Sequence, residues 1–325
     1  KYNKNEPEFS VLSNPEFLAE GTAINDLENP DRILIGGENK DAINSLVEIY
    51  KSWIPRDKII TTNLWSSELS KLTANAFLAQ RISSINTIAA FCEAAGADIK
   101  EVSMAIGSDS RIGSKFLEAG PGFGGSCFKK DILNLVYLCR HFGLIEVAEY
   151  WESVVSINDW NTKRISSLIV KTLFGTVTDK KIVILGFSFK AHTNDTRESP
   201  AIKIAKDLLE EGAKIIIYDP KVKPHQIAKE IGTDKEFEED SFTYYLDKLK
   251  GGSWCFAESL KDCFINADAV VVTTEWPEFA RLEWRLIAES MRRPGWIFDT
   301  RRIINKEDVR NTGLKFWSIG TGIIK

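Results

Sequence analysis

The stretch Gly120-Pro-Gly-Phe-Gly-Gly-Ser-Cys-Phe-Lys-Lys-Asp131 joins a glycine-rich loop directly to a predicted helix. Its four glycines allow the backbone to approach a neighbouring group closely. Apolar residues then recur at helical spacing and predict a helix over 127–142, with Cys127 in the first turn. A lone cysteine in such a place is often a small core residue. Here the glycines and the flanking charges favour a reactive thiol, because backbone N–H groups at a helix N-terminus stabilise a thiolate.

Two charged residues accompany the thiol. Asp131 follows Cys127 by four positions and therefore lies one turn away on the same helix face, and Lys130 precedes it directly. One helical turn thus offers a nucleophile, a carboxylate and a cation.

The composition indicates a soluble globular protein with more than one core. The chain has 325 residues, of which 43% are hydrophobic, and a domain typically takes roughly 100–200 residues. The net charge of −4 and the lack of a long Lys/Arg block argue against nucleic acid as a partner. No signal peptide or apolar run of about 18 residues suggests a membrane. The five cysteines form no CxxC pair, so we expect reduced thiols, no metal and a cytoplasmic location.

Residues 1–63 have the pattern of an incomplete α/β unit. Strands are expected over 8–12, 32–35 and 58–61, and a helix over 42–53. After the turn at Ser13-Asn-Pro15, the segment Glu16-Phe-Leu-Ala-Glu20 is predicted to form a loop or a single helical turn. Its two carboxylates suit acid–base chemistry, or they simply face solvent. Because so few residues cannot close such a domain, we expect the unit to begin upstream of Lys1.

Residues 64–178 are predicted to be helical. One helix over 66–95 exceeds the usual length of roughly 8–20 residues, which is typical of a connection between domains or a seam between subunits. Lys71 and Asn75 lie one turn apart on it and could hold a developing oxyanion, although such a pair is more often at the surface. Further helices are expected over 99–106, 127–142 and onward to about Gly175.

Residues 179–325 predict a doubly wound α/β domain. Strands are expected over 181–185, 214–218, 269–274, 296–298 and 315–319. Ser199-Pro200 should begin a helix that ends near Glu211, and the charged stretch 232–253 should be a surface excursion. Gly186-Phe-Ser-Phe-Lys-Ala contains only the first glycine of a GxGxxG fingerprint. A nucleotide could still bind where the strands end, and the cations that follow those ends are Lys190, Arg197, Arg301 and Arg302.

Taken together, these segments resemble the UDP-glucose 6-dehydrogenases of the UDP-glucose/GDP-mannose dehydrogenase family. The matching segments are 13–23, 65–72, 107–113, 123–131, 184–190 and 195–199. The resemblance implies three parts: the end of an NAD-binding Rossmann domain (1–63), a helical dimerisation and catalytic domain (64–178), and a Rossmann-like domain that binds a UDP-sugar (179–325). The family's GxGxxG turn would precede Lys1, so we expect this chain alone to bind a UDP-sugar weakly and not to reduce NAD.

The resemblance also implies a reaction, the four-electron oxidation of UDP-glucose to UDP-glucuronate by two NAD molecules in succession. Cys127 would trap the aldehyde as a thiohemiacetal that is oxidised to a thioester, since a covalent bond retains the aldehyde while the cofactor exchanges. Lys71 and Asn75 would stabilise the oxyanions. Asp131 would support the water or Lys71, and Glu20 would help to activate the water.

Binding residues follow from the same resemblance. The substrate-binding set is Glu16, Phe17, Leu18, Ala19, Glu20, Lys71, Asn75, Arg111, Phe116, Phe123, Gly124, Phe189, Lys190 and Arg301. The cofactor-binding set is Glu20, Cys127, Lys130 and Arg197. Arg111 would reach the substrate of a neighbouring subunit, which implies a homo-oligomer, either a dimer or a hexamer. Two alternatives stay open: a sister dehydrogenase for GDP-mannose or a UDP-N-acetylhexosamine, and a non-catalytic, oligomerising fragment that binds nucleotide sugars.

Overall fold

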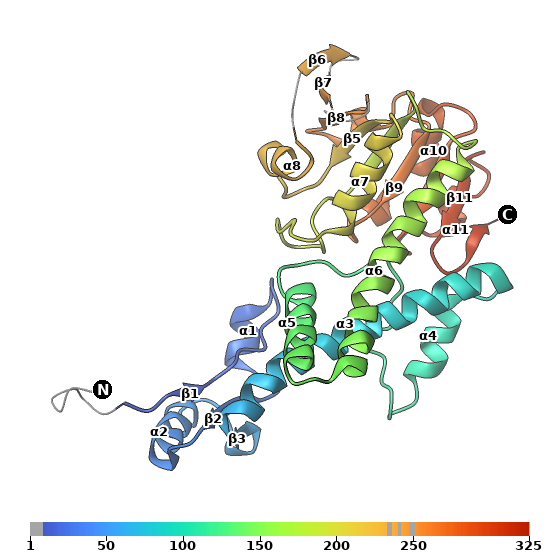
Figure 1. Cartoon of the computed structure of the whole chain (residues 1–325). Helices are drawn as coiled ribbons and strands as arrows, with labels where there is room; N and C mark the ends of the chain where they lie inside the picture. The colour runs from blue at the N-terminus through green and yellow to red at the C-terminus, as the bar shows by residue number, and fades with distance from the viewer. Residues whose placement is uncertain (1–8, 233–235, 240–241, 247–250, 325) are drawn as a thin grey trace. The chain divides into compact units, whose positions relative to one another are not determined.

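The computed structural model describes residues 9–232, 236–239, 242–246 and 251–324 (Figure 1). The chain divides into two compact units, residues 1–77 and residues 78–325, which are described separately below. Within the described ranges, no helix is both long enough and apolar enough to cross a lipid bilayer.

The first unit is built on a three-stranded sheet. Its strands are β1 (Leu12–Ser13), β2 (Ile33–Gly37) and β3 (Ile59–Thr62), in that order, with β1 antiparallel and β3 parallel to β2. Its helices are α1 (Ala23–Glu28), α2 (Lys40–Tyr50) and the short 3-10 helix η1 (Arg56–Lys58). The core is formed by Ile33, Ile35, Val47, Ile54 and Ile59.

The sequence prediction is confirmed for β2, α2 and β3, with small changes of bounds. It is wrong for most of the strand over 8–12: position 8 lies outside the described residues, 9–11 are not strand, and β1 pairs with β2 only at Leu12 and Ser13. The helix α1 was not predicted, because it has six residues and buries none of them, so it leaves no apolar pattern.

Helix α3 spans Leu64–Ala95, as predicted, and crosses from the first unit into the second. Asn63 helps to begin it by accepting a hydrogen bond from the Ser66 N–H at 2.7 Å, and Gly96 follows its end with φ of 76°. In the second unit α3 is followed by α4 (Ile99–Gly107), α5 (Phe128–His141) and α6 (Ile145–Thr172). Helices α5 and α6 pack against each other, and α6 also contacts α7.

A nine-stranded sheet forms the rest of the second unit, in the order β12-β11-β10-β9-β4-β5-β8-β7-β6. The strands from β11 to β8 are parallel, and the outermost ones pair antiparallel. The strands are β4 (Lys181–Leu185), β5 (Lys214–Tyr218), β6 (Glu236–Glu239), β7 (Phe242–Leu246), β8 (Ser253–Phe256), β9 (Ala269–Val272), β10 (Trp296–Asp299), β11 (Lys315–Ser318) and β12 (Gly322–Ile324). The helices are α7 (Pro200–Glu210), α8 (Pro224–Ile231), α9 (Leu260–Cys263), η2 (Phe279–Arg281), α10 (Trp284–Ser290) and α11 (Lys306–Val309).

Both faces of this sheet are covered. On β4, Ile182 and Ile184 pack into the cluster that contains α7 and parts of α3 and α6, whereas Val183 and Leu185 pack into the cluster that contains α9 and α10 (Figure 1). Strands buried on both sides read as continuous apolar runs, which is why the predicted strands of this domain are confirmed.

The stretch 232–253 differs from its prediction. It includes the antiparallel pair β6 and β7, which extends the sheet edge, and the start of β8. Glutamate and lysine are rare in strands, so the composition favoured a loop. Positions 233–235, 240–241 and 247–250 lie outside the described residues.

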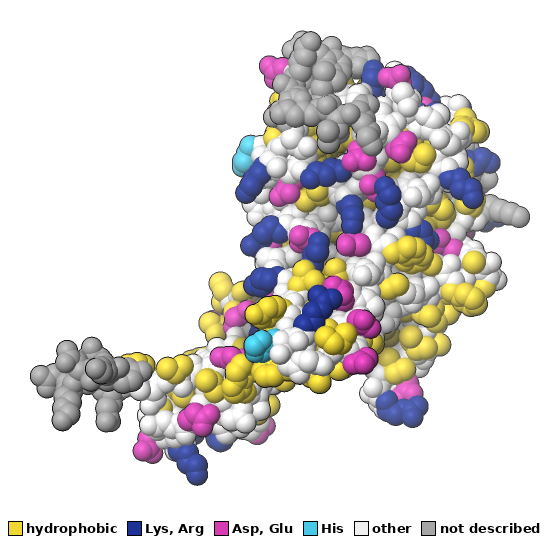
Figure 2. All heavy atoms as spheres, viewed as in Figure 1, with side chains coloured by type: hydrophobic (Ala, Val, Ile, Leu, Met, Phe, Trp, Pro, Cys, Tyr) yellow, Lys and Arg dark blue, Asp and Glu magenta, His cyan; other side chains and the backbone are white. Residues whose placement is uncertain are grey.

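On the face of the molecule drawn in Figure 2, the basic and acidic side chains of the second unit are interspersed, and no block of one sign forms.

Candidate active site

Cys127 lies at the N-cap of α5, with φ of −101° and ψ of −51°. This corrects the prediction by one residue: the helix begins at Phe128, because Cys127 still belongs to the loop. The thiol is free and exposed, and the Ser126 hydroxyl oxygen lies 3.5 Å from its Sγ atom. The Asp131 N–H donates to the Cys127 carbonyl at 2.9 Å. A nucleophilic sulfur therefore stands in solvent at the start of a well-formed helix.

The other four cysteines are buried. All five lie in the described part of the chain, and among them only Cys127 is exposed. Burial raises the pKa of Cys255 and of Cys263 to about 12, and it also raises the pKa of Cys92. Buried thiols of this kind are inert. The structure therefore singles out the same cysteine that the sequence pattern favoured.

The glycine loop before Cys127 is held by four buried polar side chains, Asn86 from α3 and Asn158, Asn161 and Thr162 from α6. Asn158 accepts from the Phe123 N–H at 2.8 Å and donates to the Phe123 carbonyl at 3.2 Å. Asn161 and Thr162 donate to the carbonyls of Gly120 and Pro121, each at 2.9 Å, and Asn86 accepts from the Gly120 N–H at 2.9 Å. Four buried side chains thus fix the first part of the loop, from Gly120 to Phe123.

The glycines of this loop are needed for close approach. A Cβ atom added to Gly124 would lie 2.6 Å from the carbonyl oxygen of Glu198 and 2.8 Å from the Cβ of Phe189. Gly125 has φ of +84°, which side chains rarely adopt, and its N–H donates to the Arg197 carbonyl at 2.8 Å. The predicted substrate residues Phe123, Gly124 and Phe189 are therefore neighbours.

Asp131 and Lys130 lie on the first turn of α5. The Asp131 side chain is largely buried, whereas the Lys130 side chain is 72% exposed and its Nζ atom lies 4.0 Å from Asp131 Oδ1. The predicted group of thiol, carboxylate and cation is therefore present within one turn. Its carboxylate faces the protein and its cation faces solvent.

In the first unit, the segment 16–20 lies beside Lys71. The Lys71 Nζ atom donates to Glu16 Oε1 at 3.3 Å, and it lies 5.4 Å from the ring centre of Phe17. The guanidinium of Arg32 also lies over that ring, 3.8 Å from its centre. Arg32 is not among the predicted site residues; it directly precedes β2.

Helix α3 carries Asn75 one turn beyond Lys71, and Asn75 is buried. Leu18, Ala19 and Glu20 complete the segment, in which the Leu18 N–H donates to Glu16 Oε2 at 2.6 Å. All these residues belong to the first unit, whereas Cys127 and Asp131 belong to the second. The structure thus brings the segment 16–20 close to Lys71 in the first unit, and it brings Cys127 close to Asp131 in the second.

The second α/β domain is organised around the buried carboxylate of Asp219, which follows β5. Its two oxygens accept six hydrogen bonds of 2.7 to 3.2 Å, from the N–H groups of Phe187, Ser188, Lys221 and Val222, the Ser188 hydroxyl and the Trp276 indole. In dinucleotide-binding domains an acidic residue in this place binds a ribose. Here protein donors occupy both oxygens, which agrees with the incomplete glycine fingerprint after β4.

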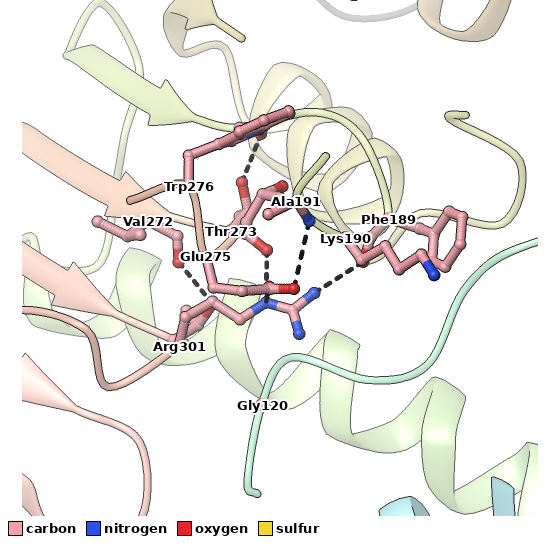
Figure 3. A network of polar contacts seen from close by, with 12 residues as sticks. Gly120, Phe189, Lys190, Ala191, Val272, Thr273, Glu275, Trp276 and Arg301 are labelled. Atoms are coloured by element: carbon pink, nitrogen blue, oxygen red, sulfur yellow. Dashed lines mark hydrogen bonds and ion pairs between the residues drawn. The ribbon is translucent and has the colours of Figure 1, made fainter. Parts of the chain in front are cut away.

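Arg301 joins the ends of three strands (Figure 3). Its Nε donates to the Thr273 carbonyl at 2.8 Å, and its Nη2 donates to the Phe189 carbonyl at 3.0 Å. Its Nε also lies 3.2 Å from Glu275 Oε2. A Cβ on Gly120 would lie 3.4 Å from its Nη1, so the guanidinium also reaches the glycine loop. Phe189 and Lys190 are close by, with the Lys190 Nζ atom 5.5 Å from the Phe189 ring centre.

Arg302 contacts other residues than Arg301 does. Its φ is 57°, and its guanidinium donates to the Ile319 carbonyl, the Thr321 hydroxyl and Asp98 Oδ1 at 2.8, 2.6 and 2.8 Å. Asp98 is the N-cap residue of α4. Of the two adjacent arginines, only Arg301 lies with the predicted binding residues.

Asp299, at the end of β10, is fully buried, and burial raises its pKa to about 6. As pH falls, the folded state therefore binds this proton before the unfolded state does. The free energy of unfolding is thus lower above about pH 6, where the buried carboxylate is charged, and it rises as pH falls through that value. Between pH 7 and pH 5, the wild type should gain about 1 kcal/mol of unfolding free energy relative to Asp299→Asn. Urea denaturation at both pH values measures this difference. Asp57→Asn removes an exposed carboxylate as the control, and a difference that does not change with pH would contradict the assignment.

Arg111 and Phe116 lie in the loop after α4. Arg111 has an 87% exposed side chain that is paired with Asp109 at 2.6 Å, and this pairing raises the pKa of Arg111 and lowers that of Asp109. Phe116 is partly exposed and has φ of 61°. Arg81 of α3 holds the loop by donating to the carbonyls of Ile112, Gly113 and Lys115 at 2.7 to 2.9 Å.

Arg197 has a 64% exposed side chain, which is paired with Asp195 at 2.8 Å, while its carbonyl accepts from the glycine loop. In the part of the chain that the structure describes, no group of three His, Cys, Asp or Glu side chains could hold a metal ion.

Three consecutive parts of the chain match known domains. Residues 1–54 match the NAD binding domain of the UDP-glucose/GDP-mannose dehydrogenase family, 65–160 match its central domain, and 183–306 match its UDP binding domain. Each match falls inside one of the three parts that the sequence predicts.

Relatives with assigned names are similar over nearly the whole chain. It is 52% identical to UDP-glucose 6-dehydrogenase of Caenorhabditis elegans, over 98% of this chain and 65% of the worm protein. It is also 52% identical to UDP-glucose 6-dehydrogenase 4 of Arabidopsis thaliana, over 98% of this chain and 68% of the plant protein. The chain thus spans about two thirds of the length of these relatives.

The fold is similar to that of a solved UDP-glucose dehydrogenase from the archaeon Pyrobaculum islandicum. The TM-score is 0.79 at 29% identity, over 97% of this chain and 64% of that one. The predicted fold class, with a helical central part and a Rossmann-like carboxy-terminal domain, is confirmed. Because the same three domains appear in the same order and half of the residues are identical to those of named members, the chain belongs to the UDP-glucose/GDP-mannose dehydrogenase family.

Proposed function

We propose that this chain carries the catalytic cysteine and the nucleotide-sugar site of an NAD-dependent UDP-glucose 6-dehydrogenase, which forms UDP-glucuronate. The observation that carries the proposal is Cys127, an exposed thiol at a helix N-cap that follows a loop clamped by buried side chains. Such a nucleophile is positioned and accessible, as covalent catalysis requires.

The reaction needs covalent attachment because it has two oxidation steps. In the first, the primary alcohol loses a proton and a hydride and becomes an aldehyde. The Cys127 thiolate then adds to the aldehyde carbon and forms a thiohemiacetal. This thiohemiacetal loses one hydride, the second of the whole reaction, and becomes a thioester. Water hydrolyses the thioester, and the acid and the free thiol are released. NAD supplies the acceptor for each hydride.

The first unit would supply the polar groups. Lys71, with Asn75 one turn away, would stabilise the alkoxide and the oxyanion of the thiohemiacetal, and Glu20 would help to activate the hydrolytic water. Asp131 would support that water or the ammonium of Lys71. The contact of Lys71 with Glu16 supports a fixed position for its cation.

The nucleotide end of the substrate is assigned to Phe189, Lys190 and Arg301. Cations suit a diphosphate, and the guanidinium can donate to two oxygens at once. For the cofactor, the exposed cations of Lys130 and Arg197 fit a second diphosphate near the cysteine loop. We assign no dinucleotide to the second α/β domain, because Asp219 has no acceptor left for a ribose.

An assembly of at least two copies belongs to the same proposal. The exposed guanidinium of Arg111 would reach the substrate of the neighbouring subunit, as the resemblance implies. We also retain the expectation of a cytoplasmic location and of three domains with bounds 1–63, 64–178 and 179–325.

Two other functions remain to be compared with this one. A sister dehydrogenase would use the same cysteine on GDP-mannose or a UDP-N-acetylhexosamine, and a non-catalytic fragment would bind a nucleotide sugar without oxidising it. Calorimetry of the 325-residue chain with UDP-glucose, UDP-N-acetylglucosamine and GDP-mannose measures the preference. We expect weak binding of UDP-glucose, and a preference for GDP-mannose would favour the sister enzyme.

The activity is tested with the product of the complete reading frame that encodes this chain. We expect two NADH per UDP-glucuronate, with NADH measured by absorbance and the acid by mass spectrometry. We expect the 325-residue chain alone to give no NADH. If the protein encoded by the complete reading frame bound UDP-glucose but formed no NADH, the result would support the non-catalytic alternative.

A further inference from the structure

We propose that the ion pair between Lys129 and Glu198 is a latch that fixes the position of the Cys127 thiol. The Lys129 Nζ atom donates to Glu198 Oε2 at 2.8 Å. Lys129 lies in the first turn of α5, and Glu198 lies in the turn that leads into α7. The consequence for catalysis rests on the proposed function, in which Cys127 is the nucleophile.

The latch completes a pair of attachments on either side of the cysteine. Before Cys127, Gly125 donates to the Arg197 carbonyl at 2.8 Å, and Gly124 packs directly on the Glu198 carbonyl. After Cys127, Lys129 binds the Glu198 side chain. Cys127 thus lies between contacts to Arg197 and Glu198 on one side and a contact to Glu198 on the other.

The conformation of Glu198 supports a fixed role for its side chain. Its φ of 54° is in the left-handed region, which is uncommon for a residue with a Cβ, costs energy and persists only where the surrounding contacts hold it. The hydrogen bond to Glu198 raises the pKa of Lys129, and Asp159 of α6, itself paired with Lys203 of α7 at 2.9 Å, acts in the same direction.

The pair should affect the thiol more than the fold. The side chains of Lys129 and Glu198 are 33% and 50% exposed, and pairs of this exposure contribute little to global stability. A released first turn, however, would move the thiol relative to the helix N-terminus, whose dipole favours a nearby anion such as a thiolate. We therefore assign Lys129 and Glu198 as positioning residues.

The test measures how fast iodoacetamide alkylates Cys127 as a function of pH, without substrate or cofactor. Because the other four cysteines are buried, the first equivalent of reagent reports Cys127, and Cys127→Ser gives the blank. We expect the midpoint of the alkylation profile to rise by about 0.2–0.7 pH units in both Lys129→Gln and Glu198→Gln, the range that loss of helix-terminus stabilisation implies. The exchanged pair, Lys129→Glu with Glu198→Lys, should restore the wild-type midpoint.

Glu198→Gln decides between a latch and a simple charge effect. If Glu198 acted only as a nearby anion, its removal would favour the thiolate and lower the midpoint, which would overturn the proposal. Unchanged midpoints in both single variants would overturn it too. Glu152→Gln is the matched control, because it removes the 2.6 Å pair of Arg140 with Glu152 at the far end of α5, and it should leave the midpoint unchanged. Circular dichroism checks that each variant is folded. Since no substrate is present, failure of this test and failure of the proposed oxidation are separate results.

Discussion

Cys127→Ser is expected to abolish the formation of UDP-glucuronate by the complete protein. A serine hydroxyl is almost fully protonated at neutral pH, so it supplies almost no anion to attack the aldehyde. An ester formed on serine would also hydrolyse more slowly than the thioester that it replaces. The check is mass spectrometry of UDP-glucuronate after a time in which the wild type completes many turnovers. The variant should yield no more acid than a blank without enzyme.

The matched control is Cys263→Ser. Cys263 is buried, and its Sγ atom donates to the Ser259 carbonyl at 3.2 Å, a hydrogen bond that serine can also make. This variant should retain acid formation. Acid formed by Cys127→Ser at a near normal rate would exclude covalent catalysis through this residue.

Lys71→Ala is expected to lower kcat by about 10²–10³, the usual effect of removing one donor to an oxyanion. In the proposed function the ammonium would act on negative charge that develops in the transition state, so kcat should fall more than the affinity for UDP-glucose. In the structure Lys71 is held by Glu16 and its side chain is 22% exposed, so the cation is already in place before substrate binds. Steady-state kinetics of the complete protein give kcat and KM separately.

Lys51→Ala is the control for this variant, because Lys51 also forms a lysine–glutamate pair in the first unit, with Glu48 at 2.8 Å, at the C-terminal end of α2. Its kinetics should match the wild type. If Lys71→Ala raised KM and left kcat intact, Lys71 would bind the ground state, and its assigned role would be wrong.

The sequence predicted those parts of the fold whose signal is local. The long helix α3 has no internal Gly or Pro, α7 begins at Ser199-Pro200, and the strands of the second sheet are apolar runs. It also selected Cys127, from the glycines before it, as the candidate nucleophile, and this assignment stays a prediction. In each case the residues that specify the element are adjacent in the chain.

The residues that position the site were not predicted, because their partners are distant in sequence. Asn158, Asn161 and Thr162 lie on one face of α6, and their partners lie 35 to 41 positions earlier. A polar face on a long helix is ordinarily solvated, so its meaning depends on which loop packs there. Such a face, placed after a loop rich in glycine, is nevertheless a pattern that could be searched for in other sequences.

The carboxylate of Asp219 sets a limit for protein engineers who want to change the nucleotide that the second α/β domain accepts. To bind a dinucleotide, the domain would have to release this carboxylate for a ribose. Its six present donors, which come from three different loops, would then lose their acceptor. Each buried donor left without an acceptor costs about 1–3 kcal/mol, so all three loops would have to be redesigned together.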